Sequence, residues 1–578
     1  MSPAGANIAA ALPAWAQEMR DLFQSGSIAQ FLIHGNVFDV VAAIGGKMLP
    51  LRVFLDDVMF AGYDVVLHYD RGRGIRASKG GEDFAQWVQQ ALGAESTSIA
   101  STREPGKALE LLDRYLLRSL NLRALAGKEP PRIAVVIDFA EFVVPRGEAL
   151  HLGGEFSSNV VKVLGWANDP AIMQSNVATV LVAEGLDDIN QLIAENPHAA
   201  KLNVPLPNEA EMLEYVRALQ SSTFKDLAER SELSIEMLAR RLTGLSRVGA
   251  HTVIANSLNN GRKLAAAQLA SMKKDMIERE CSGLLDFLES PYTLDHVAGL
   301  DAAKAWLRQD TQLLRRGALH AMPMGYLIAG RIGTGKTFLV QCWAGELGIP
   351  CVVFKNFRDR WVGATESNLE KIFAILRALG QVVVFVDEAD QAAGKREGGD
   401  TDGGLSGRVY SMLAKEMSDT RNRGRILWVF ATSRPDLLEV DLKRQGRLDV
   451  HIPLFPPQTA AEFRALLLVV AKKLRFPLAE ADLPEIPEGF ALGGNEIEGT
   501  LVRALRVNEL QGEPKRSLKV ILGEVLREVR PSAHMRKMEY MDLVAVKECT
   551  DASFLPEHFA ALTPEQIETR IDELRRFV

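Results

Sequence analysis

The sequence has little cysteine, and none of it is spaced as in a structural site. Among 578 residues there are four cysteines and no CxxC pair. No histidine cluster with metal-ligand spacing accompanies them. Neither a disulfide framework nor a zinc site is therefore supported, and a reducing compartment suits the chain. We expect it to be cytoplasmic.

Long apolar runs and a strong charge of one sign are also lacking. No window offers the about 18 uninterrupted apolar residues of a membrane span, and residues 1–20 have no basic stretch ahead of their apolar one. Lys and Arg number 67 against 74 Asp and Glu, a net charge of -7. This balance of charges argues against a protein that binds nucleic acid mainly by neutralising its phosphates. A protein with such a balance can nevertheless contain a local basic channel. We expect no membrane span and no nucleic-acid partner.

What is present is enough chain for several hydrophobic cores. At about 150 residues per domain, the length indicates about four folding units. The hydrophobic share of 47% and the charged share of 24% are those of soluble globular proteins. A single small binding module is therefore excluded.

The most informative segment is a glycine-rich stretch between an apolar run and a helical pattern. Residues 330–337 fit the pattern GxxxxGK[ST]. Glycines let backbone N–H groups surround phosphates at a helix N-terminus, Lys336 supplies a cation to the β- and γ-phosphates, and Thr337 offers a hydroxyl to Mg²⁺. The predicted nucleotide-binding residues are Gly330, Arg331, Ile332, Gly333, Thr334, Gly335, Lys336 and Thr337.

A second segment, residues 381–394, ends a β-branched apolar run with two adjacent carboxylates. Such a run is typical of a buried parallel strand, and an acid at its carboxyl end faces the phosphate loop of a doubly wound sheet. We therefore expect Asp387 to join Thr337 in holding Mg²⁺, and Glu388 to polarise the attacking water. The expected ligands are ATP and Mg²⁺.

In their order along the chain these motifs resemble those of the AAA+ ATPases, in the branch that contains katanin, spastin and the valosin-containing protein. The resemblance covers about residues 292–530. It includes residues 295–307, whose Gly299 and Leu300 would border the adenine. A third apolar run ends at Ser433, where the family usually has Asn and where this residue would position water or the γ-phosphate. The resemblance implies an ATP hydrolase.

The resemblance also implies a ring. Arg444 and Arg447 match the family's arginine-finger segment and would reach the neighbouring subunit's nucleotide. Such a finger is worth about 10³ to 10⁵ in rate, so efficient turnover should require assembly. The family's usual ring is a hexamer, and we expect a homo-oligomer.

A pore follows from the ring. Arg360, Trp361 and Val362 stand where the family has its first pore loop, and an aromatic there would grip any extended polypeptide. The predicted function is a Mg-ATP-driven motor that remodels, unfolds or disassembles a protein target through this pore. Two alternatives stay open: a nucleic-acid motor or loader, and a scaffold that uses ATP to assemble with little turnover. No HExxH motif occurs, so no metalloprotease of that kind is expected in these residues.

The first half of the chain repeats the apolar pattern of the second half without its chemistry. Residues 31–39, 132–142 and 177–188 resemble residues 326–334, 381–391 and 425–436, respectively. However, Lys47 lies twelve positions after Gly35, Phe139 stands where the second half has Glu388, and Asn196 and Ala199 replace the two arginines. We therefore predict that only the second module hydrolyses ATP, and that the first stabilises the ring or recruits a target.

The predicted fold class is α/β, with two P-loop NTPase-type modules that each consist of a doubly wound parallel sheet followed by a small helical lid. An insertion in the first module, at about residues 72–110, contacts a target or forms a plain surface loop, and nothing local decides between these. The predicted parts are an N-terminal helical segment (1–24), the degenerate α/β subdomain (25–207), its lid (208–260), a helical connector (261–291), the active α/β subdomain (292–457), its lid (458–530) and a helical tail (531–578).

Overall fold

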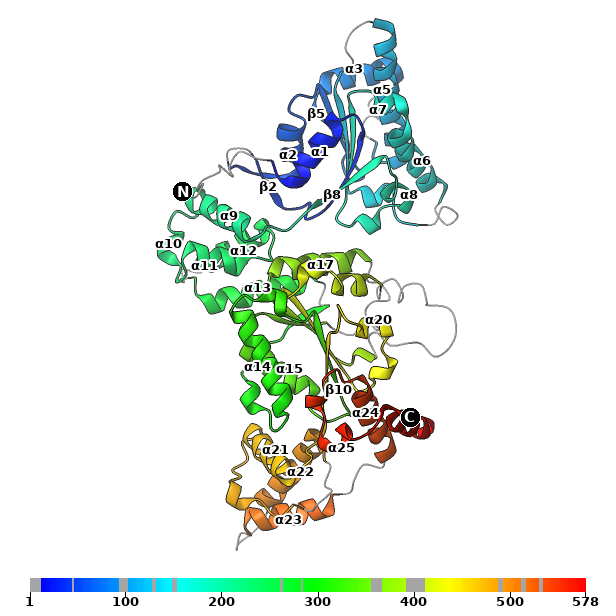
Figure 1. Cartoon of the computed structure of the whole chain (residues 1–578). Helices are drawn as coiled ribbons and strands as arrows, with labels where there is room; N and C mark the ends of the chain where they lie inside the picture. The colour runs from blue at the N-terminus through cyan, green and yellow to red at the C-terminus, as the bar shows by residue number, and fades with distance from the viewer. Residues whose placement is uncertain are drawn as a thin grey trace, which may run out of the picture. The chain divides into compact units, whose positions relative to one another are not determined.

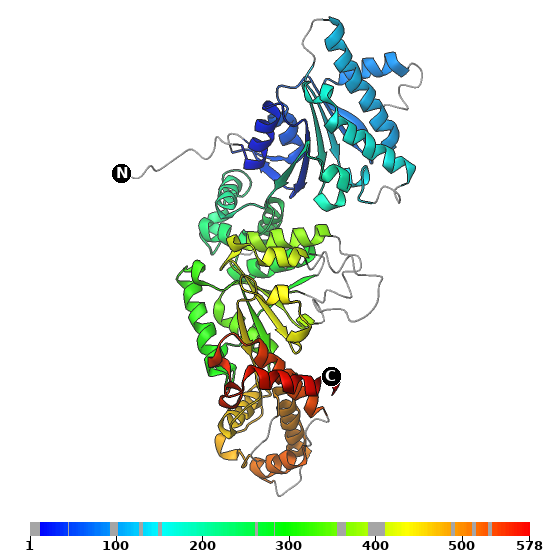
Figure 2. The same cartoon turned by 45° about the vertical axis from the view of Figure 1, so that its right-hand side comes forward.

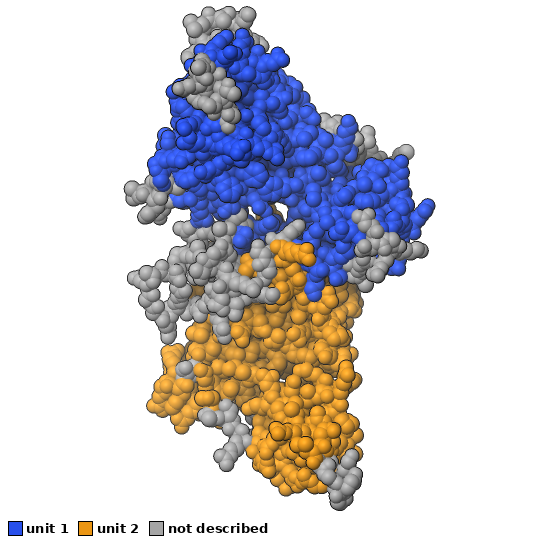
Figure 3. Space-filling view, turned by 180° about the vertical axis from the view of Figure 1, so that it is seen from behind, with its two compact units in different colours: residues 1–277, 364–378 blue, residues 278–363, 379–578 orange. Residues whose placement is uncertain are grey.

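The computed structural model of the chain contains two units. They are residues 1–277 with 364–378, and residues 278–363 with 379–578 (Figure 3). The residues that the structure describes are 12–43, 46–92, 102–126, 131–147, 153–259, 264–281, 284–354, 366–390, 411–486, 492–510, 516–529 and 534–577.

The first unit is built on a six-stranded sheet with the order β5-β4-β6-β7-β1-β8. Five strands are parallel, and β5 (Gly74–Lys79) pairs antiparallel at one edge. A short hairpin of β2 (Val40–Ala42) and β3 (Met48–Pro50) lies outside it. The parallel strands are β1 (Gln30–Gly35), β4 (Val65–Asp70), β6 (Ile133–Asp138), β7 (Val177–Val182) and β8 (Ala199–Val204).

Helices cover both faces of this sheet, as Figures 1 and 2 show. Successive side chains of a strand point to opposite faces, so a strand buried on both sides is apolar throughout. Phe31 packs on the face of α1 (Ala14–Gln24), and Leu32 packs on the opposite face. The remaining helices of this α/β part are α2 (Leu51–Phe54), the π-helix η2 (Leu55–Met59), α5 (Pro105–Ala126), α6 (Gly154–Asn168), α7 (Pro170–Met173) and α8 (Gln191–Ala194).

The described part of the insertion has regular structure. It supplies the edge strand β5 and helix α3 (Gly81–Leu92). Phe84 and Trp87 of this helix pack against Tyr115 of α5, with ring centroids 5.0 and 5.1 Å apart. The described part is therefore not a plain surface loop, because Phe84 and Trp87, three positions apart on one helix, pack into the core of the first unit.

Helices follow the first sheet and lead to the second unit. The first lid contains α9 (Glu209–Ser222), α10 (Leu227–Arg230), α11 (Ile235–Leu242) and α12 (Arg247–Asn259). A capping box at Asn208 and Glu211 begins α9. Within residues 261–291, predicted to be a helical connector, α13 (Ala266–Glu280) is helical, but β9 (Leu285–Phe287) is a strand because it pairs with β11 (Cys351–Phe354) at the edge of the second sheet.

The second sheet repeats the order of the first as β14-β10-β13-β12-β11-β9. Its antiparallel edge strand, β9 (Leu285–Phe287), precedes the parallel strands in the chain, whereas β5 lies among them. The parallel strands are β10 (Gly325–Ala329), β11 (Cys351–Phe354), β12 (Val382–Val386), β13 (Ile426–Thr432) and β14 (Val450–Pro453).

The helices of the second unit surround this sheet and form its lid. Helices α14 (Asp301–Arg315) and α15 (Lys336–Leu347) pack on one face around the buried Tyr326 and Trp343. Helix α20 (Val440–Lys443) precedes β14, whereas helix α17 (Glu366–Leu379), which lies between β11 and β12 in the chain, falls in the first unit apart from its last residue. The lid contains α21 (Ala460–Lys473), α22 (Gly494–Leu510) and α23 (Leu518–Glu528) around its own apolar core.

The tail after the lid returns to the sheet. Helix α24 (Met535–Glu548) packs on β14, and α25 (Glu557–Ala560) and α26 (Pro564–Leu574) follow it. Thr563 caps α26 through a capping box, as Thr563-Pro564-Glu565 predicts. The predicted fold class is therefore confirmed. Among the described residues, no helix is both long and apolar enough to cross a membrane.

Candidate nucleotide site

The glycine-rich loop of the second unit joins β10 to α15, as the motif requires. Gly330 approaches the neighbouring strand end so closely that a Cβ atom there would collide with the carbonyl oxygen of Leu454. The first sheet has the same feature, because a Cβ at Gly35 would lie 2.7 Å from the carbonyl oxygen of Val204. In both sheets glycine is thus required by packing between adjacent strand ends.

Lys336 begins α15 and lies among oxygen atoms of the loop. Its Nζ donates to the carbonyl oxygens of Gly330 and Arg331, at 2.8 and 2.9 Å, and to Ser433 Oγ at 3.0 Å. Burial lowers the pKa of Lys336 to about 8, while Asp387 and other nearby carboxylates act in the opposite direction. The predicted lysine and the predicted residue at the tip of β13 are thus in direct contact.

The two predicted metal ligands also meet. Thr337 Oγ1 donates to Asp387 Oδ2 at 2.8 Å. Hydroxyl and carboxylate oxygens are ligands that Mg²⁺ accepts, together with phosphate oxygens and water. Among the described residues there is no group of three or more His, Cys, Asp or Glu that could hold a metal ion by themselves. The predicted metal ligands are thus the hydroxyl of Thr337 and the carboxylate of Asp387.

Glu388 follows the metal-site aspartate in an uncommon backbone conformation. Its φ is 48°, in the left-handed region, and its side chain is exposed. Beyond it, Asp390 accepts a hydrogen bond of 2.6 Å from Thr432 Oγ1, which joins the ends of β12 and β13. Sequence reasoning did not single out Asp390, although it belongs to the same acidic stretch.

The lid contacts the loop directly. The backbone N–H of Gly494, in the first turn of α22, donates to the carbonyl oxygen of Gly333 at 2.7 Å. Gly299 and Leu300 lie at the start of α14 with φ of 64° and 54°, and a Cβ atom at Gly299 would lie 3.8 Å from Cγ of the lid residue Glu462. The predicted adenine-bordering pair therefore adjoins the same lid.

The two predicted arginine fingers differ in exposure. The Arg444 side chain is 63% exposed and forms an ion pair of 3.2 Å with Asp441. Arg447 is buried, and its Nη1 donates to the carbonyl oxygen of Asp441 at 2.6 Å. Of the two arginines, Arg444 is therefore the one whose side chain is exposed to solvent.

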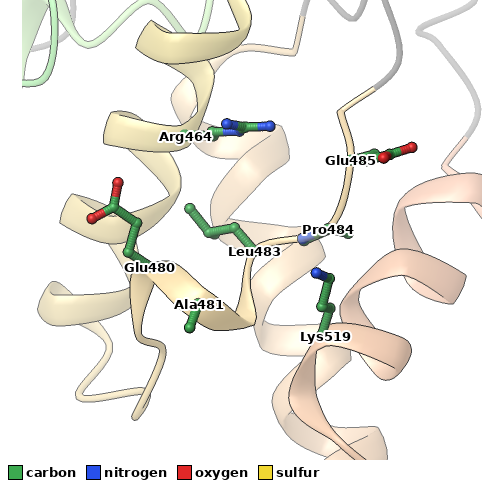
Figure 4. Close-up of a pocket in the computed structure, with 7 residues that line it drawn as sticks. All are labelled: Arg464, Glu480, Ala481, Leu483, Pro484, Glu485 and Lys519. Carbon is green, nitrogen blue, oxygen red and sulfur yellow. The ribbon is translucent and has the colours of Figure 1, made fainter.

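Ile332 is the predicted loop residue with an exposed side chain. The predicted pore residues Arg360, Trp361 and Val362 lie outside the described residues. An open pocket of about 270 Å³ lies in the second lid, away from the loop, and contains none of the predicted site residues (Figure 4). It is lined by Arg464, Glu480, Ala481, Leu483, Pro484, Glu485 and Lys519.

Helix α24 brings an unpredicted carboxylate to the loop. Asp542 Oδ2 lies 3.6 Å from Arg331 Nη1, and both side chains are 11% exposed. Burial raises the pKa of Asp542 to about 7, although Arg331 and Lys336 act to lower it. No local sequence signal identifies this contact, because the two residues are 211 positions apart.

The matching position of the first sheet is occupied differently. Asp138 ends β6 as Asp387 follows β12, and Phe139 has a φ of 54°, close to that of Glu388. However, Asp138 Oδ2 lies 3.2 Å from Nδ1 of the fully buried His68, whose Nε2 lies 2.8 Å from Asp56 Oδ1. The aspartate is thus already paired within the protein.

Aromatic side chains lie beside this pair. Phe38, in the segment after β1, has its ring centroid 5.7 Å from that of Phe139. Both rings are substantially exposed, at 60% and 46%. The end of this sheet thus has apolar side chains at the places where the second sheet has its phosphate loop and Glu388.

Models of protein families match the parts of the chain that contain the second and the first sheet separately. Residues 326–455 match the ATPase family associated with various cellular activities (AAA). Residues 2–205 match the N-terminal Rossmann-like domain of AAA+ chaperones, and residues 210–282 match their second helical domain.

Comparisons with individual proteins give the same family. The chain is 26% identical over 457 residues to a cell division cycle protein 48 homolog of Archaeoglobus fulgidus, covering 72% of this chain and 61% of that protein. It is 34% identical over 227 residues to protein SAV of Sulfolobus acidocaldarius, covering 37% and 28%. It is 31% identical over 261 residues to the ATP-dependent zinc metalloprotease FtsH 1 of Symbiobacterium thermophilum, covering 42% and 44%.

The chain thus spans between 28% and 61% of the length of these relatives. The family match at the phosphate loop, the chaperone-domain matches before it and the repeated sheet order all point the same way. Residues 326–455 are thus similar to the AAA family of ATPases, and the two segments before them are similar to the first two domains of AAA+ chaperones.

Proposed function

We propose that this chain is a Mg-ATP-hydrolysing ring motor that remodels a protein target, with hydrolysis in the second module only. The observation that carries the proposal is the cluster at the end of the second sheet. There Thr337 Oγ1 lies 2.8 Å from Asp387 Oδ2, and Lys336 Nζ reaches both the loop carbonyls and Ser433. The first sheet has no such cluster among its described residues.

The proposed chemistry assigns one task to each side chain. Lys336 exchanges its loop carbonyls for the β- and γ-phosphate oxygens when ATP binds, because its buried cation gains more from phosphate charge than from neutral carbonyls. Glu388 accepts hydrogen-bond donation from the attacking water and orients it toward the γ-phosphorus. The water oxygen then forms the new P–O bond as the bond to the β,γ-bridging oxygen breaks, ADP leaves with the electron pair of that bond, and the proton of the water passes to the Glu388 carboxylate. Thr337 and Asp387 would hold Mg²⁺, which would supply positive charge to the phosphates when bound.

Arg444 is the residue through which assembly would affect hydrolysis. Its side chain is exposed and paired only with a neighbouring surface carboxylate, a kind of pair worth little in water. The guanidinium is therefore free to exchange Asp441 for the phosphates of an adjacent subunit. A homo-oligomeric ring, with a hexamer as the expected size, supplies that arrangement.

The test uses the Glu388→Gln variant of the full chain, which should bind ATP and hydrolyse it slowly. Electron microscopy with Mg·ATP and an unfolded polypeptide should show a ring with density in its centre. Monomers under these conditions would contradict the ring, and an empty ring would contradict the pore. Loss of polypeptide unfolding in Trp361→Ala, with ATP hydrolysis retained, would assign the grip to that residue.

The same assay separates the two alternatives. ATP hydrolysis that is stimulated by single-stranded DNA in a salt-dependent way, and not by polypeptide, would indicate a nucleic-acid motor. Tight ATP binding with negligible turnover in the assembled ring would indicate a scaffold.

A further inference from the structure

A buried carboxylate of the first unit joins the sheet to the lid. Asp39 lies in the segment after β1, four positions beyond Gly35, and its side chain is 1% exposed. Its Oδ2 accepts from the backbone N–H of Arg247 at 2.8 Å, and its Oδ1 accepts from that of Val248 at 2.9 Å. These are the first two amides of α12, so one carboxylate closes the start of a lid helix that is 208 positions away in the chain.

The surroundings of Asp39 suit an anion. A helix N-terminus carries a partial positive charge and N–H groups without partners in the helix, so it favours an anion that offers an oxygen to each amide. Asn36 Nδ2 donates to Asp39 Oδ2 at 2.9 Å, and Nη1 of Arg247 lies 3.9 Å from the same oxygen. Arg247 Nη1 also donates to the carbonyl oxygen of Val40 at 3.3 Å, which gives α12 a second connection to this segment. These donors compensate the carboxylate for its loss of hydration.

The loop of the second unit brings no carboxylate to its lid. Residues 330–337 contain no acidic residue, and the fourth position after Gly330 is Thr334. There the backbone N–H of Gly494, in the first turn of α22, donates to the carbonyl oxygen of Gly333. This bond between loop and lid is neutral, whereas the lid of the first unit is bonded to a charged group.

We propose that Asp39 is a positioning residue that supplies, from within the protein, the anion that holds the first lid on the first sheet. The inference rests on the proposed restriction of ATP hydrolysis to the second module. A lid whose anion is a bound phosphate can respond to the presence of that ligand, because the ligand favours one lid position over another. The Asp39 carboxylate is part of the chain, so the first lid keeps its place throughout the ATP cycle.

The experiment is hydrogen–deuterium exchange of the full chain, followed in peptides that cover residues 246–250. In the wild type these amides should be protected to the same extent with and without Mg·ATP. In Asp39→Ala they should exchange at least about tenfold faster, because the hydrogen bonds of Arg247 and Val248 to a charged oxygen are lost. Unchanged exchange in Asp39→Ala, or additional protection of these wild-type residues by Mg·ATP, would overturn the proposal.

Added formate separates a role of the charge from a role in packing. Asp39→Ala leaves space for a small carboxylate beside the two amides, so formate should restore most of the lost protection. Formamide, similar in size but uncharged, should restore none at the same concentration. Equal effects of the two compounds, or no effect of formate, would contradict an anion as the group that holds the lid.

A second variant covers the case in which Asp39→Ala does not fold, as judged by thermal unfolding. Asp39→Asn has nearly the same volume and keeps one acceptor oxygen. It should therefore exchange at a rate between those expected for the wild type and for Asp39→Ala. Exchange equal to that of the wild type would contradict a requirement for the charge.

The matched control is Ser234→Ala in the same lid. Ser234 caps α11, where its Oγ accepts from the backbone N–H of Met237 at 3.3 Å, so this cap lies within the lid itself. Its loss should raise exchange at the start of α11 and leave residues 246–250 unchanged, with no response to formate. Equal acceleration of residues 246–250 in Ser234→Ala would count against a specific role of Asp39.

Failure of this inference is distinguishable from failure of the proposed function. A wild-type chain without ATPase activity would refute the proposed motor, and the exchange of Asp39→Ala could still be compared with that of the wild type. A wild-type chain with ATPase activity, in which Asp39→Ala exchanges as the wild type does, would refute only the role of Asp39.

Discussion

The two sheets share a strand order but not the side chains at their carboxyl ends. Asp138 and Asp387 follow corresponding strands, and the next residue has a left-handed backbone in both sheets. In the second sheet the aspartate faces Thr337, whereas in the first it faces the buried His68. The same backbone arrangement therefore places the aspartate in two different settings. In the second sheet its carboxylate is available to a metal that would bind with a nucleotide, and in the first sheet it is paired with a side chain of the protein.

The strand register shows how this difference arises. His68 pairs in register with Val136, and Val353 of the second sheet pairs with Phe385 at the matching position. A histidine side chain from β4 can reach the aspartate, and a valine from β11 cannot. Burial opposes a charge on His68, but its hydrogen bonds to Asp138 and Asp56 outweigh this and raise the pKa of His68.

The largest expected effect tests whether only one module hydrolyses ATP. Lys336→Ala should lower the ATPase rate of the full chain by at least about 10³-fold, because the phosphates lose their buried cation. Lys47→Ala, in the first module, is the matched control and should leave the rate unchanged. Steady-state phosphate release measures both, and a Lys336→Ala chain that still turned over ATP would place hydrolysis in the first module as well.

The next effect tests the division of roles between the two arginines. Arg444→Ala should lower the assembled ATPase rate by about 10³-fold with little change in ATP affinity, as expected for a side chain that acts on a neighbour. Arg447→Ala should instead lower the melting temperature, because Arg447 is buried against Asp441. Mixing Arg444→Ala subunits with Lys336→Ala subunits should restore part of the activity. No recovery in the mixture would contradict an arginine that acts between subunits.

A smaller effect tests the different partners of Asp138 and Asp387. His68→Val places the second-sheet residue in the first sheet, and loss of the buried partner should cost about 3 to 5 kcal/mol of unfolding free energy in the first unit. Calorimetry of the full chain resolves this transition. The exposed His198→Gln is the control, and an equal melting temperature for His68→Val would contradict a stabilising role for the pair.

The same pair predicts a pH dependence. Because the pKa of His68 is raised in the folded protein, protonation stabilises the first unit fully below the unfolded value of about 6.5. That contribution is lost as pH rises through the folded value. The difference in melting temperature between wild type and His68→Val should therefore shrink from pH 6 to higher pH.

The smallest effect concerns Ser433, which stands where the family usually has Asn. Ser433→Asn should raise kcat by about two- to fivefold, because the longer amide can reach water or the γ-phosphate without a bridging water. Ser433→Ala is the companion variant and should lower kcat. Equal rates for all three would show that this position does not contribute to turnover.

The parts of the fold that could be predicted are those with a local signal. The glycine-rich loop, the acidic end of β12 and the repeated apolar runs each lie within a short stretch, so periodicity and residue type were sufficient. The contact of Lys336 with Ser433, and of Thr337 with Asp387, then followed from the topology of a parallel sheet.

The rest depends on packing between segments that are distant in the chain. Asp542 reaches Arg331 only because α24 returns to β14 after the lid, and nothing in residues 535–548 indicates that return. The His68 pair needs the register of β4 against β6, and the edge strand β9 lies in a segment predicted to be wholly helical. The residues around Arg447 likewise did not predict that its side chain would be buried.

The close approach at Gly35 and Gly330 changes how a phosphate-loop motif should be searched for. Both glycines sit against a carbonyl oxygen of the adjacent strand end, although only one of them precedes a lysine at the required spacing. In these two sheets the first glycine of the motif is thus explained by its close approach to the adjacent strand end. It does not indicate whether the module binds a nucleotide. Other chains can be searched for the lysine and for the acid at the strand end, without regard to that glycine. We expect such a search to separate modules that bind a nucleotide from related modules that do not.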